Sequence, residues 1–158
     1  MTDPSTPPVL TVIGAGRLGR VLARLWADRG VFAIGDLVTR DAATAAGAAR
    51  FVGAGRPRAP GEALAPADVA LVSVPDDRLG EAAAWLAGQG ALRPGALAFH
   101  GRGAHAADLL APLRDAGAAV ASAHPVHSFA DPARSLAAFA GSACALEGDD
   151  AALDRLEP

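Results

Sequence analysis

Three glycines near the start of the chain have a spacing suited to holding phosphate groups. The residues are Gly14-Ala15-Gly16-Arg17-Leu18-Gly19, which match the pattern G-x-G-x-x-G. Residues 9–13 before them are typical of a buried strand, and residues 17–29 have the periodicity of an amphipathic helix. The first glycine would permit a tight turn, the second would leave room for a pyrophosphate, and the third would allow close helix–strand packing. Because free N–H groups at a helix start favour anions, we predict a dinucleotide site; the alternative is a glycine-rich turn without a ligand.

The residues that end the next predicted strand bear on which dinucleotide is bound. Thr39-Arg40 stands there, about 20 residues after the last glycine, where NAD sites place an acidic residue. A guanidinium can bind a 2′-phosphate that a carboxylate would repel, so Arg40 favours NADP, and Arg17 adds charge nearby. The alternative is NAD, with Asp36 or Asp41 binding the ribose if the strand ends elsewhere.

Further candidates follow later predicted strands. Ligands of open parallel sheets lie outside the carboxyl ends of the strands, so we expect Val74-Pro75-Asp76 to border the ribose and phosphates of the cofactor. His100 and His124 also stand at strand ends. A histidine there could move the proton that accompanies hydride transfer, which makes both candidate catalytic residues. The alternative for each is a cap or turn residue bonded to the backbone. We expect His105 to open the next helix and His127 to be solvated.

Other site chemistries have little support in the sequence. His124, His127 and Asp131 could be metal donors, but the spacing beside a proline is poor for zinc and no cysteine is near, so we expect no metal. No serine lies in a G-x-S-x-G turn, which argues against a serine hydrolase. Asp76-Asp77 is not a catalytic pair, because adjacent side chains diverge; Asp77 is expected to cap a helix.

Composition narrows the classes further. The 158 residues have a net charge of −3 and a pI near 5.7, whereas a nucleic-acid-binding domain is usually strongly basic. The sequence has no lysine and no tyrosine, which excludes a Walker loop, a lysine Schiff base and a Tyr-x-x-x-Lys dehydrogenase. The single cysteine, Cys144, allows no internal disulfide. No apolar run approaches a membrane span. We expect a soluble, cytoplasmic protein with a small-molecule substrate and neither nucleic acid nor membrane as partner.

Strand-like and helix-like segments alternate along the chain, as in parallel sheets with crossover helices. We predict an α/β fold: a doubly wound, mostly parallel sheet with helices on both faces. Residues 51–66 are rich in Gly and Pro and are expected to be loop, with little room for a strand. The predicted strands are 9–13, 34–39, 69–74, 97–100, 118–123 and 143–146. The predicted helices are 17–29, 41–49, 77–87, 106–116 and one that opens at residue 149 or 150.

We expect three segments along the chain. Residues 1–8 would be a flexible leader, and residues 9–148 would form one cofactor-binding domain. Residues 149–158 would begin a helix that leads to a further, helical domain absent from this sequence.

These motifs together resemble a known bacterial family. The resemblance lies in Ile13-Gly-Ala-Gly-Arg-Leu-Gly19, Thr39-Arg40, Val72-Ser-Val-Pro-Asp76, His100 with Gly103-Ala104, and His124-Pro125 followed by Ser128-Phe129. Family members have an NAD(P)-binding Rossmann-like domain followed by a helical domain of unknown function. They belong to the 6-phosphogluconate-dehydrogenase-like superfamily, near pyrroline-5-carboxylate reductase.

The resemblance implies the cofactor-binding half of an oxidoreductase whose substrate is not established. It also implies a homodimer formed through the carboxyl-terminal helical domain, which normally completes the active site. One local departure stands out, because Gly101-Arg102 replaces the small hydroxyl residues usual in the family. Arg102 would then either change the substrate, towards an anion, or mark lost activity.

Two hypotheses about function follow. The first is an NADP-dependent oxidoreductase that transfers hydride to or from a small carbonyl, imine or hydroxy compound. The second is a regulatory module that binds NAD(P) without chemistry, since a fold alone does not imply a reaction.

Overall fold

The computed structural model describes residues 6–157; residues 1–5 of the predicted leader and Pro158 lie outside the described part. The strands are β1 (Val9–Ile13), β2 (Ala33–Val38), β3 (Arg56–Arg58), β4 (Ala67–Val72), β5 (Leu92–His100), β6 (Ala119–Pro125) and β7 (Cys144–Gly148). The α-helices are α1 (Arg17–Asp28), α2 (Ala42–Val52), α3 (Leu79–Gln89), α4 (Ala111–Asp115), α5 (Pro132–Ala138) and α6 (Asp150–Leu156). Two 3-10 helices, η1 (Asp76–Arg78) and η2 (Ala107–Leu110), precede α3 and α4.

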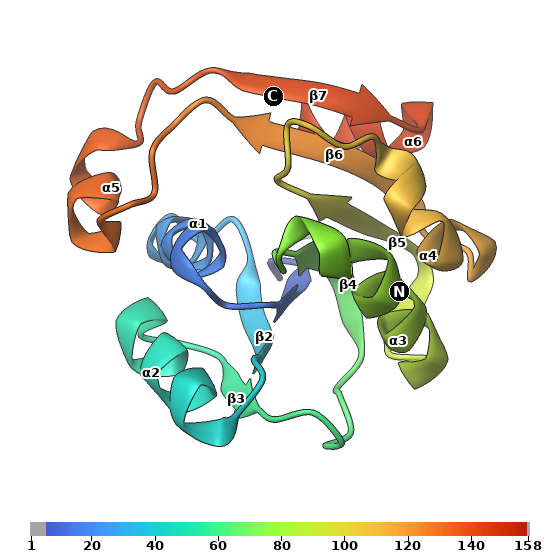
Figure 1. The fold of residues 1–158 in the computed structure, drawn as a ribbon, viewed down its shortest axis with the longest axis horizontal. Coiled ribbons are helices and arrows are strands. Elements are labelled where there is room, and N and C mark those ends of the chain that lie inside the picture. Colours follow the sequence, from blue (N-terminus) through green and yellow to red (C-terminus); the bar gives the residue numbers. More distant parts are fainter. Residues whose placement is uncertain (1–5, 158) are drawn as a thin grey trace.

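The strands form one sheet in the order β3-β2-β1-β4-β5-β6-β7 (Figure 1). All neighbouring pairs are parallel except β6 and β7, which are antiparallel. This confirms the predicted doubly wound, mostly parallel α/β fold. The strand order reverses between β1 and β4, and ligands of such sheets bind at this switch point, outside the carboxyl ends of the strands.

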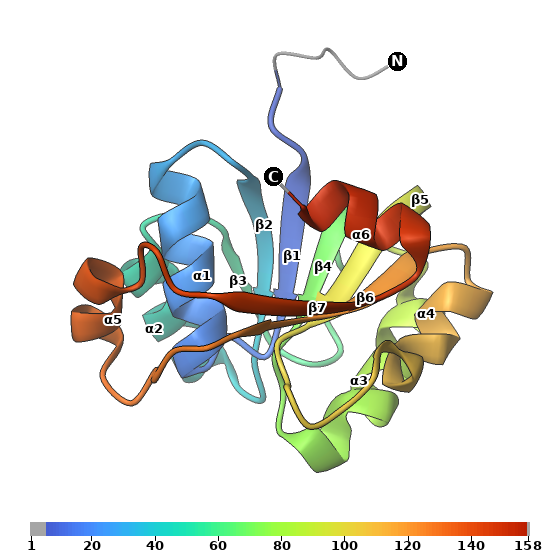
Figure 2. The same cartoon turned by 90° about the horizontal axis from the view of Figure 1, so that it is seen from above.

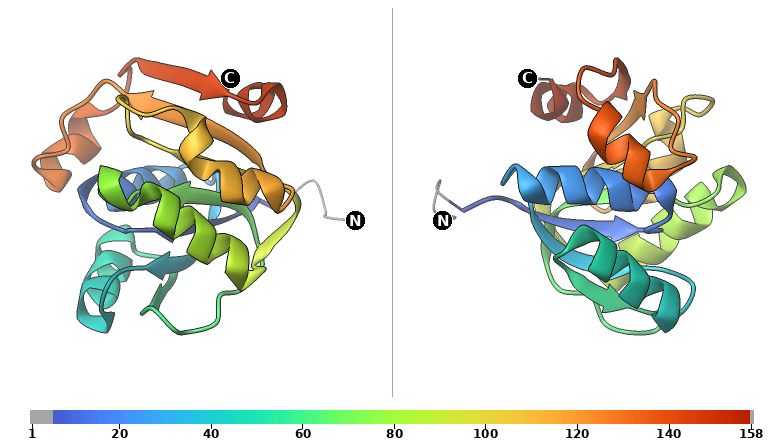
Figure 3. Two further views of the ribbon diagram at one scale, coloured as in Figure 1. Left: turned by 45° about the vertical axis from the view of Figure 1, so that its right-hand side comes forward. Right: turned by 90° about the vertical axis from the view of Figure 1, so that its left-hand side faces the viewer.

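Alternating side chains of the strands build a core on each face of the sheet. In β4, Val69 and Leu71 belong to one core and Ala70 and Val72 to the other. Helices α1, α2 and α6 contribute to the first core, and Phe129 and Phe139, on either side of α5, pack against it; α3, η2 and α4 contribute to the second core. Figure 3 shows α3 and α4 in front in the left view, and α1, α2 and α5 in front in the right view. Because the central strands are buried on both faces, the fold holds their ends in fixed positions.

The loops that carry the candidate residues gather at one end of the sheet. Figure 2 shows the loops after β1, β4, β5 and β6 along its lower edge, the end towards which the parallel strands point. The two ends of the described chain lie at the opposite end of the molecule.

Two elements differ from the sequence prediction because tertiary contacts form them. The segment expected to be loop contains β3, whose Arg-Pro-Arg sequence has no strand character of its own but pairs with Asp36, Leu37 and Val38 of β2. Strand β5 begins at Leu92, five residues before the predicted start, and its first part contains Pro94 and Gly95. In this first part only Leu92 pairs with β4, opposite Ala67, and after an irregularity in the register the pairing resumes at Leu97.

Three local predictions were wrong. Asp77 does not cap the following helix; it lies inside η1, and α3 starts after Arg78 without a side-chain cap. His105 does not open a helix, because η2 begins after Ala106 and His105 instead contacts Asp76. Helix α5 was not predicted, although Asp131 as its N-cap and Pro132 in its first turn are ordinary start signals.

Candidate functional site

The first and third glycines of the loop are required by close packing. Gly14 has a φ of +87°, and a Cβ there would lie 2.6 Å from the Ser73 carbonyl oxygen. A Cβ at Gly19 would lie 2.8 Å from the Gly14 carbonyl oxygen and 3.2 Å from a Val12 methyl carbon. The N–H of Gly14 donates to the Val38 carbonyl at 2.8 Å, so the loop is joined to both β2 and β4. These contacts give the turn and the close helix–strand packing that the spacing predicted.

The second glycine faces open space. A Cβ at Gly16 would meet no atom within 4 Å, and the residue is exposed. Gly16 is the N-cap of α1, and no side chain caps that helix start. A helix N-terminus with free N–H groups and room in front of it suits a pyrophosphate. Arg17, next in sequence, is exposed at the same end.

The residues after β2 divide between the interior and the solvent. β2 ends at Val38, and Thr39 is buried, with its hydroxyl donating to the Asp41 carbonyl at 2.7 Å. The Arg40 side chain is 91% exposed and lies 3.6 Å from the Asp41 carboxylate. Asp41 caps α2, and the bonds from the Thr44 N–H and hydroxyl lower the pKa of its carboxyl group. Arg40 is therefore free to meet a ligand at the end of β2.

Asp36, one of the two alternatives for binding a ribose, is buried within β2 before the strand end. Its carboxylate is fully buried and accepts bonds from the Ala65 N–H at 2.7 Å and from Arg58 at 3.3 Å. Arg56 lies 3.2 Å from the same carboxylate. This arrangement anchors β3 and the loop before β4 to β2, which is a structural role.

His100, at the end of β5, uses both ring nitrogens for the loop that follows. Nδ1 accepts the Arg102 N–H at 3.1 Å, so Nε2 carries the proton and donates to the Ala106 carbonyl at 3.0 Å. The side chain is fully buried, and burial lowers the pKa of the imidazole. This geometry is that of a neutral loop anchor, the second of the two roles considered for His100.

His124, on β6, is more open. Its Nδ1–H donates to the Gly101 carbonyl at 3.1 Å, which leaves Nε2 with a lone pair. The side chain is only partly buried. A Cβ at Gly103 would lie 2.7 Å from Nε2, so only glycine fits beside the ring. Orientation by a carbonyl on one nitrogen and a lone pair on the other is the arrangement a general base needs.

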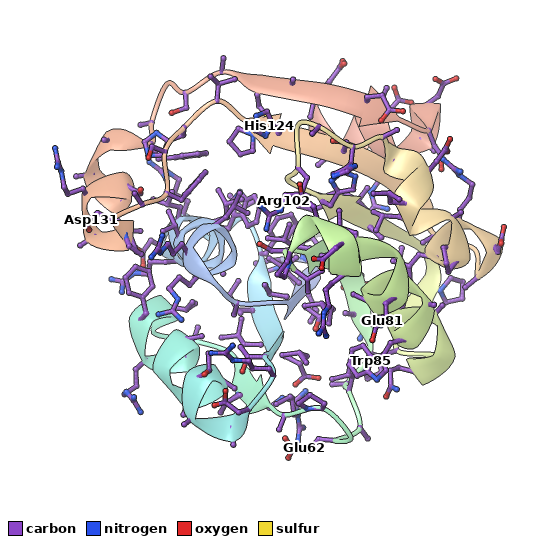
Figure 4. All side chains as sticks on the ribbon, in the orientation of Figure 1. Glu62, Glu81, Trp85, Arg102, His124 and Asp131 are labelled. Atoms are coloured by element: carbon purple, nitrogen blue, oxygen red, sulfur yellow. The ribbon has the colours of Figure 1, made fainter. Side chains whose placement is uncertain are left out.

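The loop after β5 is also joined to the loop after β4. One terminal nitrogen of Arg102 donates to the Val74 carbonyl at 3.0 Å, and its Nε lies 3.0 Å from the Asp76 carboxylate. The other oxygen of that carboxylate lies 3.2 Å from His105 Nε2. Figure 4 shows Arg102 between the loop after β5 and the start of α3, with His124 on the neighbouring strand. Val74 and Asp76 thus lie in the loop after β4, beside the loop after β5, and both already have partners.

The residues considered for a metal serve other purposes. His127 packs edge-on against Phe129 and Phe139, with ring centroids 5.0 and 5.4 Å away, so it is not simply solvated. Asp131 accepts N–H bonds from the first turn of α5. Within residues 6–157 no three His, Cys, Asp or Glu side chains gather as metal ligands do. His127 and Asp131 instead line an open cavity of about 300 Å³ beside α5.

A comparison with protein families agrees with this geometry: residues 5–125 match the Rossmann-like domain. The chain belongs to the Rossmann-like domain family. The match covers the strands β1 to β6 and the loops after β1, β2, β4 and β5. A search of curated proteins gave no match.

Solved structures of the same fold include those of dehydrogenases and reductases. A candidate NADP oxidoreductase from Bacteroides fragilis superposes with a TM-score of 0.72 at 20% identity, over 94% of this chain and 55% of that one. Prephenate dehydrogenase from A. aeolicus, solved with hydroxyphenyl propionate and NAD+, gives 0.71 at 16% identity, over 98% and 56%. Pyrroline-5-carboxylate reductase from Coxiella burnetii gives 0.66 at 14% identity, over 93% and 51%. This Rossmann-like chain therefore spans about half the length of the structures it matches.

Sequence reasoning missed the partners that orient the histidines. Gly101 supplies a carbonyl to His124, and Gly103 supplies space beside its ring. The glycines themselves were the only signal, since two of them stand within three residues after a buried strand. Within the described residues, no helix of this Rossmann-like domain has both the length and the apolar character needed to cross a bilayer.

Proposed function

We propose that this chain binds NADP(H) and is the cofactor domain of an oxidoreductase that transfers hydride to or from a small carbonyl, imine or hydroxy compound. The observation that carries the proposal is the contrast among the loop glycines. Gly14 and Gly19 are packed against Ser73 and β1, whereas Gly16 faces open space at the uncapped start of α1. A turn that served folding alone would not need an open second glycine.

The preference for NADP rests on Arg40. Its guanidinium is exposed immediately after β2, where it can bind a 2′-phosphate through paired N–H bonds. The alternative of NAD through Asp36 is less favoured because that carboxylate is buried and already bonded to Arg58 and Ala65. Arg17 at the start of α1 adds a second positive charge near the phosphates.

For the chemical step, the proposal assigns His124 the movement of the proton. When bound, the nicotinamide would supply or accept the hydride. The lone pair on His124 Nε2 can accept the proton of a hydroxyl substrate, and the protonated ring can return it to a carbonyl or imine product in the reverse direction. The Gly101 carbonyl holds the Nδ1–H in both states. His100 positions the loop that supplies this carbonyl.

The remaining parts of the proposal concern segments outside this sequence. We propose that a helical domain following α6 contributes to the substrate site and joins two copies into a homodimer. A second candidate function is an NAD(P)-binding regulatory module without chemistry. It is favoured by one observation: His100 has no free ring nitrogen, which leaves His124 as the single candidate for proton transfer at the end of β5 and β6.

Calorimetric titration with NADPH and NADH tests the cofactor. We expect NADPH to bind more tightly and Arg40→Ala to weaken NADPH roughly 10- to 100-fold, with little effect on NADH, because bonds to a charged phosphate are lost. Arg29→Ala is the matched control, since it removes an exposed arginine beyond the opposite end of α1. Equal binding of the two nucleotides to wild type and Arg40→Ala would contradict the NADP assignment.

A variant of His124 separates the two candidate functions. In the complete gene product, His124→Gln is expected to lower turnover of NADPH with carbonyl or imine substrates about 10²- to 10⁴-fold and to leave NADPH affinity unchanged. No turnover by wild type across a broad substrate panel, with NADPH binding intact, would favour the regulatory module.

A further inference from the structure

Arg102 is held in an unusual way: its backbone is fixed and its side chain reaches across to another loop. Its N–H donates to buried His100, and its carbonyl accepts the Ser122 hydroxyl at 3.4 Å. Its guanidinium meets the Val74 carbonyl and the Asp76 carboxylate, each at 3.0 Å. The guanidinium is therefore the part of Arg102 that can move without unfolding the loop.

We call the contact of the Arg102 guanidinium with Val74 and Asp76 the bridge. Its position relative to the proposed cofactor site follows from the strand order. The glycine loop at the end of β1 lies at the switch point, and Arg40 after β2 lies on the side proposed for the adenosine half of the cofactor. The nicotinamide half must then extend the other way, past the ends of β4 and β5. Gly14 packs directly against Ser73 and Val74, so the bridge from Arg102 to Val74 begins beside the glycine loop.

The bridge contributes little to holding the loops in place. The Arg102 and Asp76 side chains are 41% and 45% exposed, and ion pairs with that exposure stabilise proteins weakly. The loop after β5 is already fixed by the bonds of His100 and His124. Asp76 would also keep His105 as a partner if Arg102 moved away. The contact can therefore break and form again with both loops intact.

We infer that the Arg102 side chain, held by Asp76 and the Val74 carbonyl, spans the nicotinamide half of the proposed cofactor site. We call this side chain the strap; it must leave Asp76 and Val74 before that half of the cofactor can enter. This inference rests on the proposed function. It gives Arg102 a role in positioning and access, in place of the anion-binding role suggested by its charge. It also assigns Asp76 as the partner that holds the strap shut, and Val74 as a carbonyl released to the ligand on opening.

The test compares the whole cofactor with its adenosine half. NADPH and 2′,5′-ADP are titrated by calorimetry into wild type, Arg102→Ala and Asp76→Asn. Because the closed strap opposes only the nicotinamide half, we expect both variants to bind NADPH about three- to tenfold more tightly and to bind 2′,5′-ADP as wild type does. The double variant should bind NADPH no more tightly than Arg102→Ala alone, since the two residues form one contact.

Arg78→Ala is the matched control, because Arg78 is an exposed arginine in η1 beside Asp76. It should leave both affinities unchanged. Arg102→Met, which keeps the aliphatic part of the side chain but has no donor for Val74 or Asp76, replaces Arg102→Ala if that variant does not fold. If the Arg102 variants bind 2′,5′-ADP normally and NADPH no more tightly than wild type does, the strap is overturned and the proposed function stands. Weaker NADPH binding in these variants would mean that Arg102 contacts the cofactor. Failure of wild type to bind either compound would overturn the proposed function and the strap with it.

Discussion

At the scale of single residues, the three loop glycines should respond differently to substitution. A Cβ at Gly16 would meet no protein atom within 4 Å, so Gly16→Val is expected to lower the free energy of unfolding by no more than about 1 kcal/mol, the cost of valine at a helix N-cap. It should nevertheless weaken NADPH binding at least roughly tenfold, because the methyl groups occupy the space in front of the α1 N-terminus. Calorimetry and urea unfolding of the same sample measure the two effects.

Gly19→Ala, in contrast to Gly16→Val, is expected to act mainly on stability. Its Cβ would lie 2.8 Å from the Gly14 carbonyl oxygen, so we expect a loss of about 1–3 kcal/mol in unfolding free energy. If Gly16→Val destabilised the chain as much as Gly19→Ala, the space at Gly16 would not be a ligand site.

His100 makes the stability of the chain depend on pH in a defined window. Burial lowers the pKa of the folded imidazole below its value of 6.5 in the unfolded chain. The unfolded state therefore binds more protons as the pH falls below about 6.5, and the folded state loses stability by up to about 1.4 kcal/mol per pH unit until the folded pKa is reached. Above pH 7 the imidazole is neutral in both states, so the stability of the chain no longer changes with pH through His100.

Urea unfolding of wild type and His100→Gln between pH 5 and pH 8 checks the sign. The wild-type free energy of unfolding should fall towards pH 5, and the slope should be smaller in the variant. A wild-type slope of the opposite sign would mean that the folded state holds His100 protonated. Asp41 and Asp149, whose carboxyl pKa values are lowered by hydrogen bonds, lose their contributions only at more acidic pH.

Residue types predicted the glycine turn and the strand end before Arg40 better than the contacts that support the candidate site. The glycine spacing and the place of Arg40 follow from local sequence, because both depend on a strand end that periodicity locates. The bonds from His100 to Arg102 and Ala106 depend on how the loop after β5 folds back on the end of that strand. The bond from His124 to Gly101 depends on how the ends of β5 and β6 meet. No spacing within one segment carries that information.

At the scale of elements, Asp36 and β3 illustrate a contact that replaces local propensity. Asp36→Asn should lower the free energy of unfolding by roughly 2–4 kcal/mol, because it leaves Arg56 and Arg58 without their buried partner. Glu62→Gln, at the half-exposed partner 3.9 Å from Arg58, should cost less than about 1 kcal/mol. A stable Asp36→Asn variant with altered nucleotide preference would instead support Asp36 as a ribose ligand.

The difference between local propensity and tertiary contacts also explains which elements could be predicted from the sequence. β1, β4 and β6 are runs of small or β-branched apolar residues, and α1 has one apolar face, so their own patterns identify them. β3 consists of arginine and proline, and it is a strand because β2 pairs with all three of its residues. The first part of β5 contains arginine, proline and glycine, and it joins the sheet through Leu92, which pairs with Ala67 of β4. The seven residues of α5 are too few to show a period, so only the start signals at Asp131 and Pro132 marked it.

At the scale of the whole molecule, the order of the strands brings separate loops together at one edge of the sheet, where the candidate site lies. The loops after β1, β2, β4, β5 and β6 come from residues far apart in the chain, yet all lie at the carboxyl ends of adjacent strands (Figure 2). β1 and β4 are central and buried on both faces, so we expect the strands that hold the glycine loop and Val74 to open only with the whole domain. Binding at this edge should therefore be coupled to global unfolding.

That coupling gives a prediction for thermal stability. NADPH binds only the folded chain, so at a concentration of 100 times Kd it should add about 2.7 kcal/mol to the free energy of unfolding. For a domain of this size the Tm should rise by roughly 5–10 °C, and the rise should grow with the logarithm of the NADPH concentration. Differential scanning calorimetry measures the Tm of wild type with NADPH and with NADH, and the Tm of Gly16→Val with NADPH. Comparing the three shifts in Tm separates binding at a specific site from general effects of the solute. An equal rise in Gly16→Val would place the nucleotide somewhere other than the glycine loop, because that variant keeps the fold and fills the space where the pyrophosphate is proposed to lie.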